Sequence, residues 1–329
     1  MSENPKLEVA LFEIRRVIAG QEGMLERVLV CLLAGGHLLI EGVPGLAKTL
    51  TIKTTAAVLG GSFNRVQFTP DLVPSDLVGT RVYRPDKSEF ETELGPVFCN
   101  FLLADEINRA PAKVQSALLE VMQEHQVTIG HNTFPVPDPF LVLATQNPIE
   151  SEGTYPLPEA QIDRFMLKVL VDYPSHDEEL TVVTRSLESP PELAQVLSLE
   201  ELSALQKKAG EVYVDPALIS WSVGVATATR RPREHGLEEI ADYVSYGASP
   251  RGPISLIAAS RALALIHGRD YVVPADLQAL AYDALRHRLV LSYRALAEEV
   301  QPDAILEKVI AAVPMPQIDL GHRTAAAAS

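Results

Sequence analysis

The chain has 329 residues, a formal net charge of −15, 47% hydrophobic residues and 22% charged residues, the composition of a globular protein long enough for two domains. The acidic balance argues against a broad surface for DNA, RNA or anionic membranes. The longest apolar run, residues 28–40, is broken by two glycines and His37 and is too short to cross a bilayer, and the start lacks a signal pattern, so we expect a cytoplasmic protein without membrane insertion.

The first informative segment is an apolar run, residues 38–40, followed by a glycine-containing turn and a run with helical character, residues 50–59. This order predicts a phosphate-binding loop, because backbone N–H groups and a helix N-terminus attract anions. Lys48 would reach the outer phosphates and Thr49 would ligate Mg²⁺. Ala47 stands where the second glycine of such loops is expected, and by itself the turn is also compatible with an ordinary loop. The residues expected to bind the nucleotide here are Gly42, Val43, Pro44, Gly45, Leu46, Ala47, Lys48, Thr49 and Leu50.

Short apolar runs separated by helical patterns predict an α/β fold with a five-stranded parallel sheet covered on both faces. The runs are residues 38–40, 65–68, 101–104, 140–144 and 166–171. Ligands of such sheets bind outside the carboxyl ends of the strands. The polar residues that follow these runs are therefore the candidates for the active site.

Two of the runs end in residues suited to nucleotide hydrolysis. Asp105 follows a buried strand and suits Mg²⁺ held through Thr49 and water, while Glu106 could polarise an attacking water. The alternative is that both acids begin the next helix. Asn147 follows another strand and could contact the γ-phosphate or orient the water, or could simply form a turn before a proline.

Two β-hairpins are predicted at residues 78–96 and 124–136. The second contains His125 and His131, which read as exposed hairpin residues because no third metal ligand is apparent. Cys31 and Cys99 lie in apolar contexts and read as reduced core residues.

The character of the sequence changes near residue 174. Ser175 with Glu178 and Ser198 with Glu201 are capping-box patterns that begin helices. Strand-like runs disappear from there to about residue 314. We expect a nucleotide-binding core at residues 1–174, a linker helix region at 175–196, an all-helical lid at 197–316 and a tail at 317–329.

The order of these motifs resembles that of the AAA+ ATPases. The sequence segments themselves are similar to those of one AAA+ family, the MoxR family, over almost the whole chain. The segments that carry the resemblance are residues 17–21, 42–49, 66–77, 105–111, 144–148, 159–165 and 247–251. In this family the loop alanine is usual, so Ala47 is no argument against nucleotide binding.

The resemblance implies a doubly wound core followed by a helical lid, with ATP and Mg²⁺ bound between them at a subunit boundary. Ile18, Gly20 and Gln21 would lie near the adenine. Arg251 matches the second sensor, which contacts the γ-phosphate from the lid, and Arg164 matches the arginine finger, which reaches the ATP of the neighbouring subunit.

For Arg109, just beyond the acidic pair, a local salt bridge or a role at the start of a helix is favoured over a contact with a neighbouring subunit.

The resemblance also implies an ATPase that hydrolyses ATP to ADP and phosphate and drives chaperone-like remodelling or maturation of protein complexes. The expected partners are copies of the chain in a ring, six by family expectation, a protein with a von Willebrand factor A domain, and a client complex. The two hairpins resemble insertions that line the central pore in this branch, with ordinary solvated hairpins as the alternative.

The sequence disfavours three other functions. A DNA-dependent motor related to MCM helicases is disfavoured by the net charge of −15. A nucleotide-gated scaffold with little turnover is disfavoured by Glu106 and Arg164. A small-molecule kinase lacks a recognisable acceptor pocket.

Overall fold

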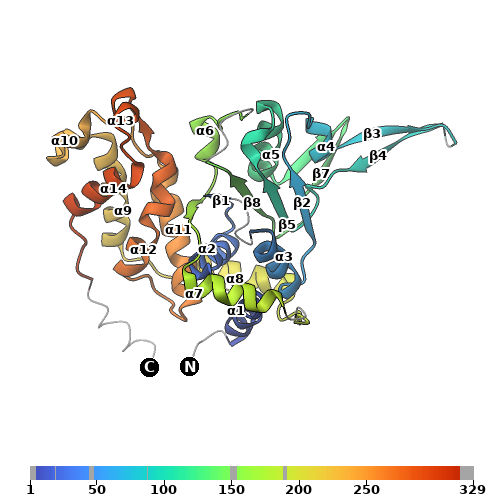
Figure 1. The fold of residues 1–329 in the computed structure, drawn as a ribbon, viewed down its shortest axis with the longest axis horizontal. Helices are drawn as coiled ribbons and strands as arrows, with labels where there is room; N and C mark the ends of the chain where they lie inside the picture. The colour runs from blue at the N-terminus through green and yellow to red at the C-terminus, as the bar shows by residue number, and fades with distance from the viewer. Residues whose placement is uncertain are drawn as a thin grey trace.

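A computed structural model of the chain describes residues 5–18, 20–43, 48–86, 88–148, 154–187 and 191–318. An α/β core is followed by a largely helical region (Figure 1). The core helices are α1 (Pro5–Val17), α2 (Glu22–Leu33), α3 (Lys48–Val58), α4 (Pro74–Val78), α5 (Ala112–Glu124) and α6 (Glu159–Ile162). The helices that follow are α7 (His176–Ser186), α8 (Leu199–Glu211), α9 (Pro216–Arg230), α10 (Glu238–Ala241), α11 (Arg251–Ile266), α12 (Pro274–Leu285), α13 (Tyr293–Ala297) and α14 (Pro302–Ala312).

The central sheet has five parallel strands in the order β2-β5-β8-β1-β9. They are β1 (Leu38–Gly42), β2 (Phe63–Gln67), β5 (Phe101–Asp105), β8 (Leu141–Gln146) and β9 (Leu167–Val171). All five strands predicted from the apolar runs are confirmed. Because the strands are parallel, their carboxyl ends lie on one edge of the sheet, where α3 begins after β1.

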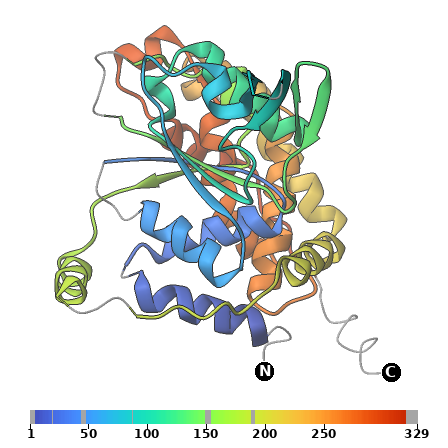
Figure 2. The same ribbon diagram turned by 90° about the vertical axis from the view of Figure 1, so that its right-hand side faces the viewer.

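Successive side chains of the strands enter two separate cores. Leu38, Ile40, Leu103 and Leu143 pack with α1, α2 and α3. Their neighbours Leu39, Leu102, Ala104, Val142 and Ala144 pack with α4 and α5. Figure 2 shows the sheet nearly edge-on, with the blue helices α1 to α3 below it and the blue-green helices above. Burial on both faces explains why these strands read as continuous apolar runs.

Both predicted hairpins are present. β3 (Gly79–Arg84) pairs with β4 (Glu89–Leu94), and this ribbon extends away from the core in Figure 1. β6 (Gln126–Ile129) pairs with β7 (Asn132–Pro135). His131 is exposed on the second hairpin, and the part of the chain that the structure describes contains no cluster of His, Cys, Asp and Glu suited to a metal.

The predicted helix starts at Ser175 and Ser198 are confirmed, because each serine caps its helix in a reciprocal pair with the glutamate three residues later. The helical character predicted for this region is confirmed, with one addition. Strands do occur here: β10 (Val244–Tyr246) and β11 (Val290–Leu291) form a small antiparallel pair. Strands of three and two residues are too short to produce a visible alternation in the sequence.

The helical region contacts the start of β9 through the 3₁₀ helix Arg286–Arg288. Arg286 donates to the Lys168 carbonyl at 2.7 Å, and His287 Nε2 lies 3.1 Å from the Phe165 carbonyl.

Both predicted core cysteines are buried free thiols. Within the described residues, every helix is too short or too polar to serve as a transmembrane span.

Candidate functional site

The carboxyl edge of the sheet brings together most of the predicted active-site residues. β1 is hydrogen-bonded to β8, and β8 to β5, so the residues that follow these strands are neighbours. Lys48 and Thr49 open α3, Asp105 ends β5, and the buried Asn147 follows β8. Pro44, Gly45, Leu46 and Ala47 of the predicted phosphate loop lie outside the described residues. Gly42 and Val43 lead into that loop, and Leu50 is partly exposed in the first turn of α3.

Lys48 faces the acidic end of the site. Its Nζ donates to the Gly42 carbonyl at 2.8 Å. Partial burial lowers the pKa of Lys48, while Asp105, Glu41 and Glu106 act in the opposite direction by stabilising its charge. The ammonium group is therefore held within the electrostatic reach of both candidate acids.

The two acids are tied to each other by Thr145, which lies on β8. The Thr145 hydroxyl donates to Asp105 Oδ1 at 2.6 Å and accepts from the Glu106 backbone N–H at 2.8 Å. Thr145 is 2% exposed, so its rotamer is fixed by packing. Glu106 has a left-handed backbone with φ of 55°, which turns its side chain away from the strand direction. A single hydroxyl thus fixes the Asp105 carboxylate and the backbone from which the Glu106 side chain extends.

Three further side chains bind the acids. Arg65 Nη2 lies 2.6 Å from Asp105 Oδ2 and 3.1 Å from Gln67 Oε1. Gln67 Nε2 donates to Glu106 Oε2 at 2.8 Å, and Arg109 Nη1 donates to the same oxygen at 3.0 Å. The local salt bridge favoured for Arg109 is therefore present.

The donor set fits a magnesium ion. Thr49 supplies a hydroxyl at the helix start and Asp105 a carboxylate, which are the hard oxygen ligands that Mg²⁺ prefers. Asp105 already holds one cationic group, the Arg65 guanidinium, at 2.6 Å. The carboxylate is therefore directed toward a place where a cation is stabilised.

The predicted adenine segment lies at the start of α2, against the link between β9 and α7. Ile18 is buried, Gly20 has φ of 71° and Gln21 has φ of 55°. Gln21 Nε2 donates to the Asp172 carbonyl at 3.2 Å. A Cβ added at Gly20 would lie 3.0 Å from Glu178 Oε1, so glycine allows α7 to approach this segment.

Arg251 lies at the junction of the core and the helical region. Its Nη1 is 3.6 Å from Asp163 Oδ2. The Ser249 hydroxyl also contacts Asp163, at 2.9 Å, and accepts from the Arg251 backbone N–H at 3.1 Å. The second half of this junction is Arg288, whose Nε is 2.9 Å from Asp163 Oδ1.

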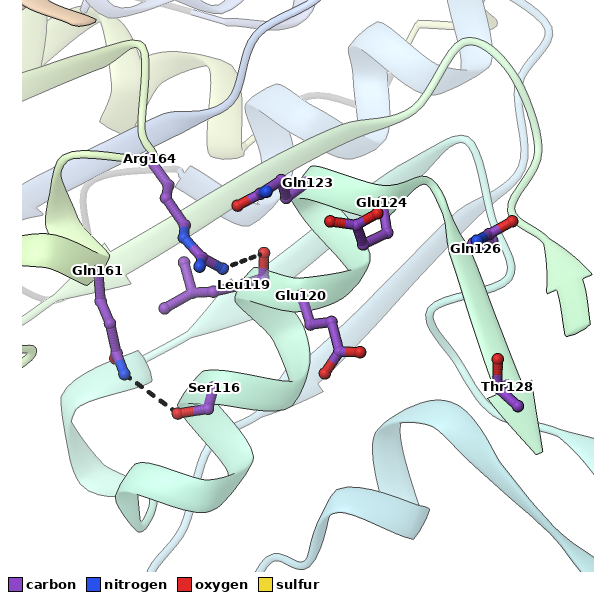
Figure 3. Close-up of a pocket in the computed structure, with 9 residues that line it drawn as sticks. All are labelled: Ser116, Leu119, Glu120, Gln123, Glu124, Gln126, Thr128, Gln161 and Arg164. Atoms are coloured by element: carbon purple, nitrogen blue, oxygen red, sulfur yellow. Dashed lines mark hydrogen bonds between the residues drawn. The ribbon is translucent and has the colours of Figure 1, made fainter. Parts of the chain in front are cut away.

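Arg164 lies apart from Lys48 and the acids, beside a cavity of about 540 Å³ on the outer face of α5 (Figure 3). Its Nη1 donates to the Leu119 carbonyl at 2.9 Å, and its side chain makes no ion pair with another described residue. Gln161 donates to the Ser116 hydroxyl across one end of the cavity, at 3.1 Å. Glu120 and Glu124 line the same space.

Comparison with known proteins agrees with this geometry. Residues 37–167 match the ATPase family associated with various cellular activities (AAA), and residues 238–309 match the AAA lid domain. The sheet order, the acid pair at its carboxyl edge and the helical region after it define an AAA+ ATPase fold.

Individual proteins similar to this chain show which family of AAA+ ATPases it belongs to. The chain is 56% identical to "Chaperone MoxR1" of Mycobacterium tuberculosis over 95% of this chain and 83% of that protein. It is 31% identical to "Protein MoxR" of Paracoccus denitrificans, over 91% and 93% of the two chains. A crystal structure of a candidate ATPase from Cytophaga hutchinsonii superposes with a TM-score of 0.90 at 47% identity, covering 95% of each chain. The chain belongs to the MoxR family of AAA+ ATPases.

Several residues of the site were missed from sequence. Thr145 lies in a segment whose predicted site residue is Asn147, and Arg65 and Gln67 lie on an edge strand for which the sequence predicted no site residue. The available signal was the alternation within β2. Residues 65 and 67 lie on the same face of the strand and both are polar, which a strand buried on both faces would not allow.

Proposed function

We propose that the chain hydrolyses ATP to ADP and phosphate and uses the cycle to remodel other proteins. The observation that carries this proposal is the convergence of three groups at one edge of the sheet: Lys48 opens α3 after β1, Asp105 ends β5, and Glu106 follows it, with both acids bound to Thr145 of the intervening strand β8. A cation for phosphate oxygens, a carboxylate for a metal ion and a second carboxylate for water are the groups that phosphoryl transfer to water requires.

Each group has a distinct task in this proposal. Lys48 and the N-terminus of α3 bind the phosphates, and Glu106 orients the attacking water and accepts its proton. Asn147 contacts the γ-phosphate or the water. Thr49 and Asp105 would hold Mg²⁺, which when bound neutralises charge on the phosphate oxygens.

Two arginines would complete the site. We assign Arg164 to the ATP of a neighbouring subunit, because its side chain lines an open cavity away from Lys48 and has no carboxylate partner among the described residues. Arg251 would approach the γ-phosphate from the lid after leaving Asp163, where its contact is long and half-exposed. A guanidinium at either place stabilises charge that develops in the transition state.

This assignment requires a neighbouring subunit, and a ring of copies, six by family expectation, would supply one to every site. We propose that residues 1–174 form the nucleotide-binding core and residues 197–316 the lid. The name of the Mycobacterium relative, "Chaperone MoxR1", supports a client that is a protein, and we propose that this client is part of a complex. A partner with a von Willebrand factor A domain is part of the same proposal.

Steady-state ATPase activity measured across protein concentrations tests the shared site. Specific activity of the wild type should rise with concentration, because each site needs a neighbour. Arg164→Ala should lose at least about 100-fold in kcat while it still binds ATP. Arg231→Ala is the matched control, since Arg231 is an exposed lid arginine that pairs with Glu234.

Activity independent of concentration, together with an active Arg164→Ala variant, would refute the shared site. Failure of the wild type to hydrolyse ATP at any concentration would refute the enzymatic proposal itself.

A further inference from the structure

Arg65 lies on the edge strand of the sheet, beside the acid that is assigned to the metal. β2 and β5 are in parallel register, with Arg65 opposite Leu103 and Gln67 opposite Asp105. Residues two apart on a strand share a face, so Arg65, Gln67 and Asp105 all project toward the side covered by α3. The long side chain of Arg65 runs along the strand and reaches Asp105 Oδ2 at 2.6 Å.

Both oxygens of Asp105 are engaged. Oδ1 accepts from the Thr145 hydroxyl at 2.6 Å and Oδ2 binds Arg65. The two bonds differ in character. Thr145 is buried and fixed, whereas the Arg65 side chain is 48% exposed and can swing into solvent. The charged partner of Asp105 is therefore the replaceable one.

A structural role explains this pair poorly. Among the described residues, Arg65 hydrogen-bonds to Asp105 and Gln67 at the rim of an edge strand, and half-exposed ion pairs contribute little to stability. Its electrostatic effect on the site is larger, because a guanidinium on Asp105 repels any second cation brought to the same carboxylate.

We propose that Arg65 is a resident cation on Asp105 that competes with Mg²⁺ for this carboxylate. When a metal–nucleotide complex binds, Arg65 leaves Asp105 and keeps its second partner, Gln67 Oε1, at 3.1 Å. Arg65 thereby sets the concentration of free Mg²⁺ that nucleotide binding requires. The inference rests on the proposed function, because it takes Asp105 as a metal ligand.

Neutral variants of Arg65 test the competition without relying on turnover. Fluorescent ADP is kept at a fixed concentration together with the protein, and free Mg²⁺ is increased stepwise. The Mg²⁺ concentration that gives half of the maximal binding signal is then read from the curve. Arg65→Ala should lower that concentration about three- to tenfold, the size expected when one nearby charge is removed from a partly exposed site. Arg65→Gln, which keeps a polar side chain beside Gln67, should lower it in the same direction and protects the test against misfolding of the alanine variant.

Arg84→Ala is the matched control, because it removes one positive charge from the β3–β4 hairpin, where Arg84 pairs with Glu91 and Glu93. Its half-saturating Mg²⁺ concentration should equal that of the wild type. An unchanged or higher value in both folded Arg65 variants would overturn the competition while leaving nucleotide binding intact. An equal decrease in Arg84→Ala would also overturn it, since the effect would then be one of net charge. A wild type that binds no nucleotide at any Mg²⁺ concentration would overturn the proposed function and this inference together.

Discussion

The Asp163 carboxylate of the core and the Arg288 guanidinium of the lid form an ion pair, with Nε 2.9 Å from Oδ1 and the arginine side chain only 1% exposed. Arg288 also donates to the carbonyl of Phe165 at 2.8 Å and to the Ser255 hydroxyl at 3.0 Å. Burial lowers the pKa of Arg288 to about 10, and Asp163 opposes that shift. Since Asp163 also contacts Arg251, the same carboxylate holds the lid to the core and restrains the predicted sensor.

Replacement of Arg288 by methionine should destabilise the protein by about 3–5 kcal/mol, because it leaves Asp163 and several carbonyls without their buried donor. Urea unfolding followed by circular dichroism measures this change. Arg294→Met is the control, since Arg294 is 58% exposed in its pairs with Asp242 and Glu298, and its cost should be below about 1 kcal/mol. Equal losses in the two variants would contradict the special role of the Asp163–Arg288 pair.

Replacement of Thr145 by valine should misalign the acid pair while preserving side-chain volume. The variant loses the bonds to Asp105 and to the Glu106 N–H, so stability should fall by about 1–3 kcal/mol. We expect kcat to fall about tenfold with KM changed less, as steady-state kinetics would show. Thr181→Val removes an exposed hydroxyl bond on α7 and should leave kcat unchanged. A kcat in Thr145→Val equal to that of the wild type would show that the hydroxyl does not position the acids.

Glu106→Gln removes the base but keeps an oxygen that can accept from Gln67 and Arg109. If Glu106 accepts the proton of the attacking water, kcat should fall by about 10²–10⁴. Affinity for fluorescent ATP should change much less, because the phosphate-binding groups remain. Glu298→Gln, at an exposed lid acid, should retain full activity. Turnover of Glu106→Gln equal to the wild type would favour a nucleotide-gated scaffold.

Acid should destabilise the protein through His37, which is fully buried between α5 and β8. Its Nδ1 accepts from the Val142 N–H at 3.1 Å and its Nε2 lies 3.1 Å from the Met122 carbonyl. Burial lowers the pKa of His37 from 6.5 to about 4. Between these values the unfolded chain binds more protons than the folded one, so the free energy of unfolding falls as pH decreases through this window. The contribution of His37 is on the order of 3 kcal/mol.

Urea unfolding of the wild type and of His37→Gln at several pH values between 4 and 7 measures this contribution. The variant should show a shallower loss of stability over the window, and His131→Gln, at an exposed hairpin position, should match the wild type. Part of the acid dependence should remain in His37→Gln, because burial also lowers the pKa of His287. Parallel pH profiles for wild type and His37→Gln would contradict the assignment.

Much of the fold was readable from local patterns. Five apolar runs gave the five strands because a parallel sheet covered on both faces excludes polar residues from its strands. Ser175 and Ser198 marked helix starts because a capping box is a bond between residues three apart. The pair β10 and β11 was missed, since two or three residues carry no period.

The sequence by itself determined which groups could do the chemistry: Lys48, Asp105, Glu106 and Asn147 follow buried strands, and parallel strands end on one edge. Only the tertiary structure decided what holds those groups. Thr145 and Arg65 bind Asp105 from different strands, 40 residues away in each direction, and Arg288 binds Asp163 from 125 residues away. Such contacts depend on strand order and on the docking of the lid, which are set by the packing of surfaces far apart in the chain. Local spacing carries no information about them.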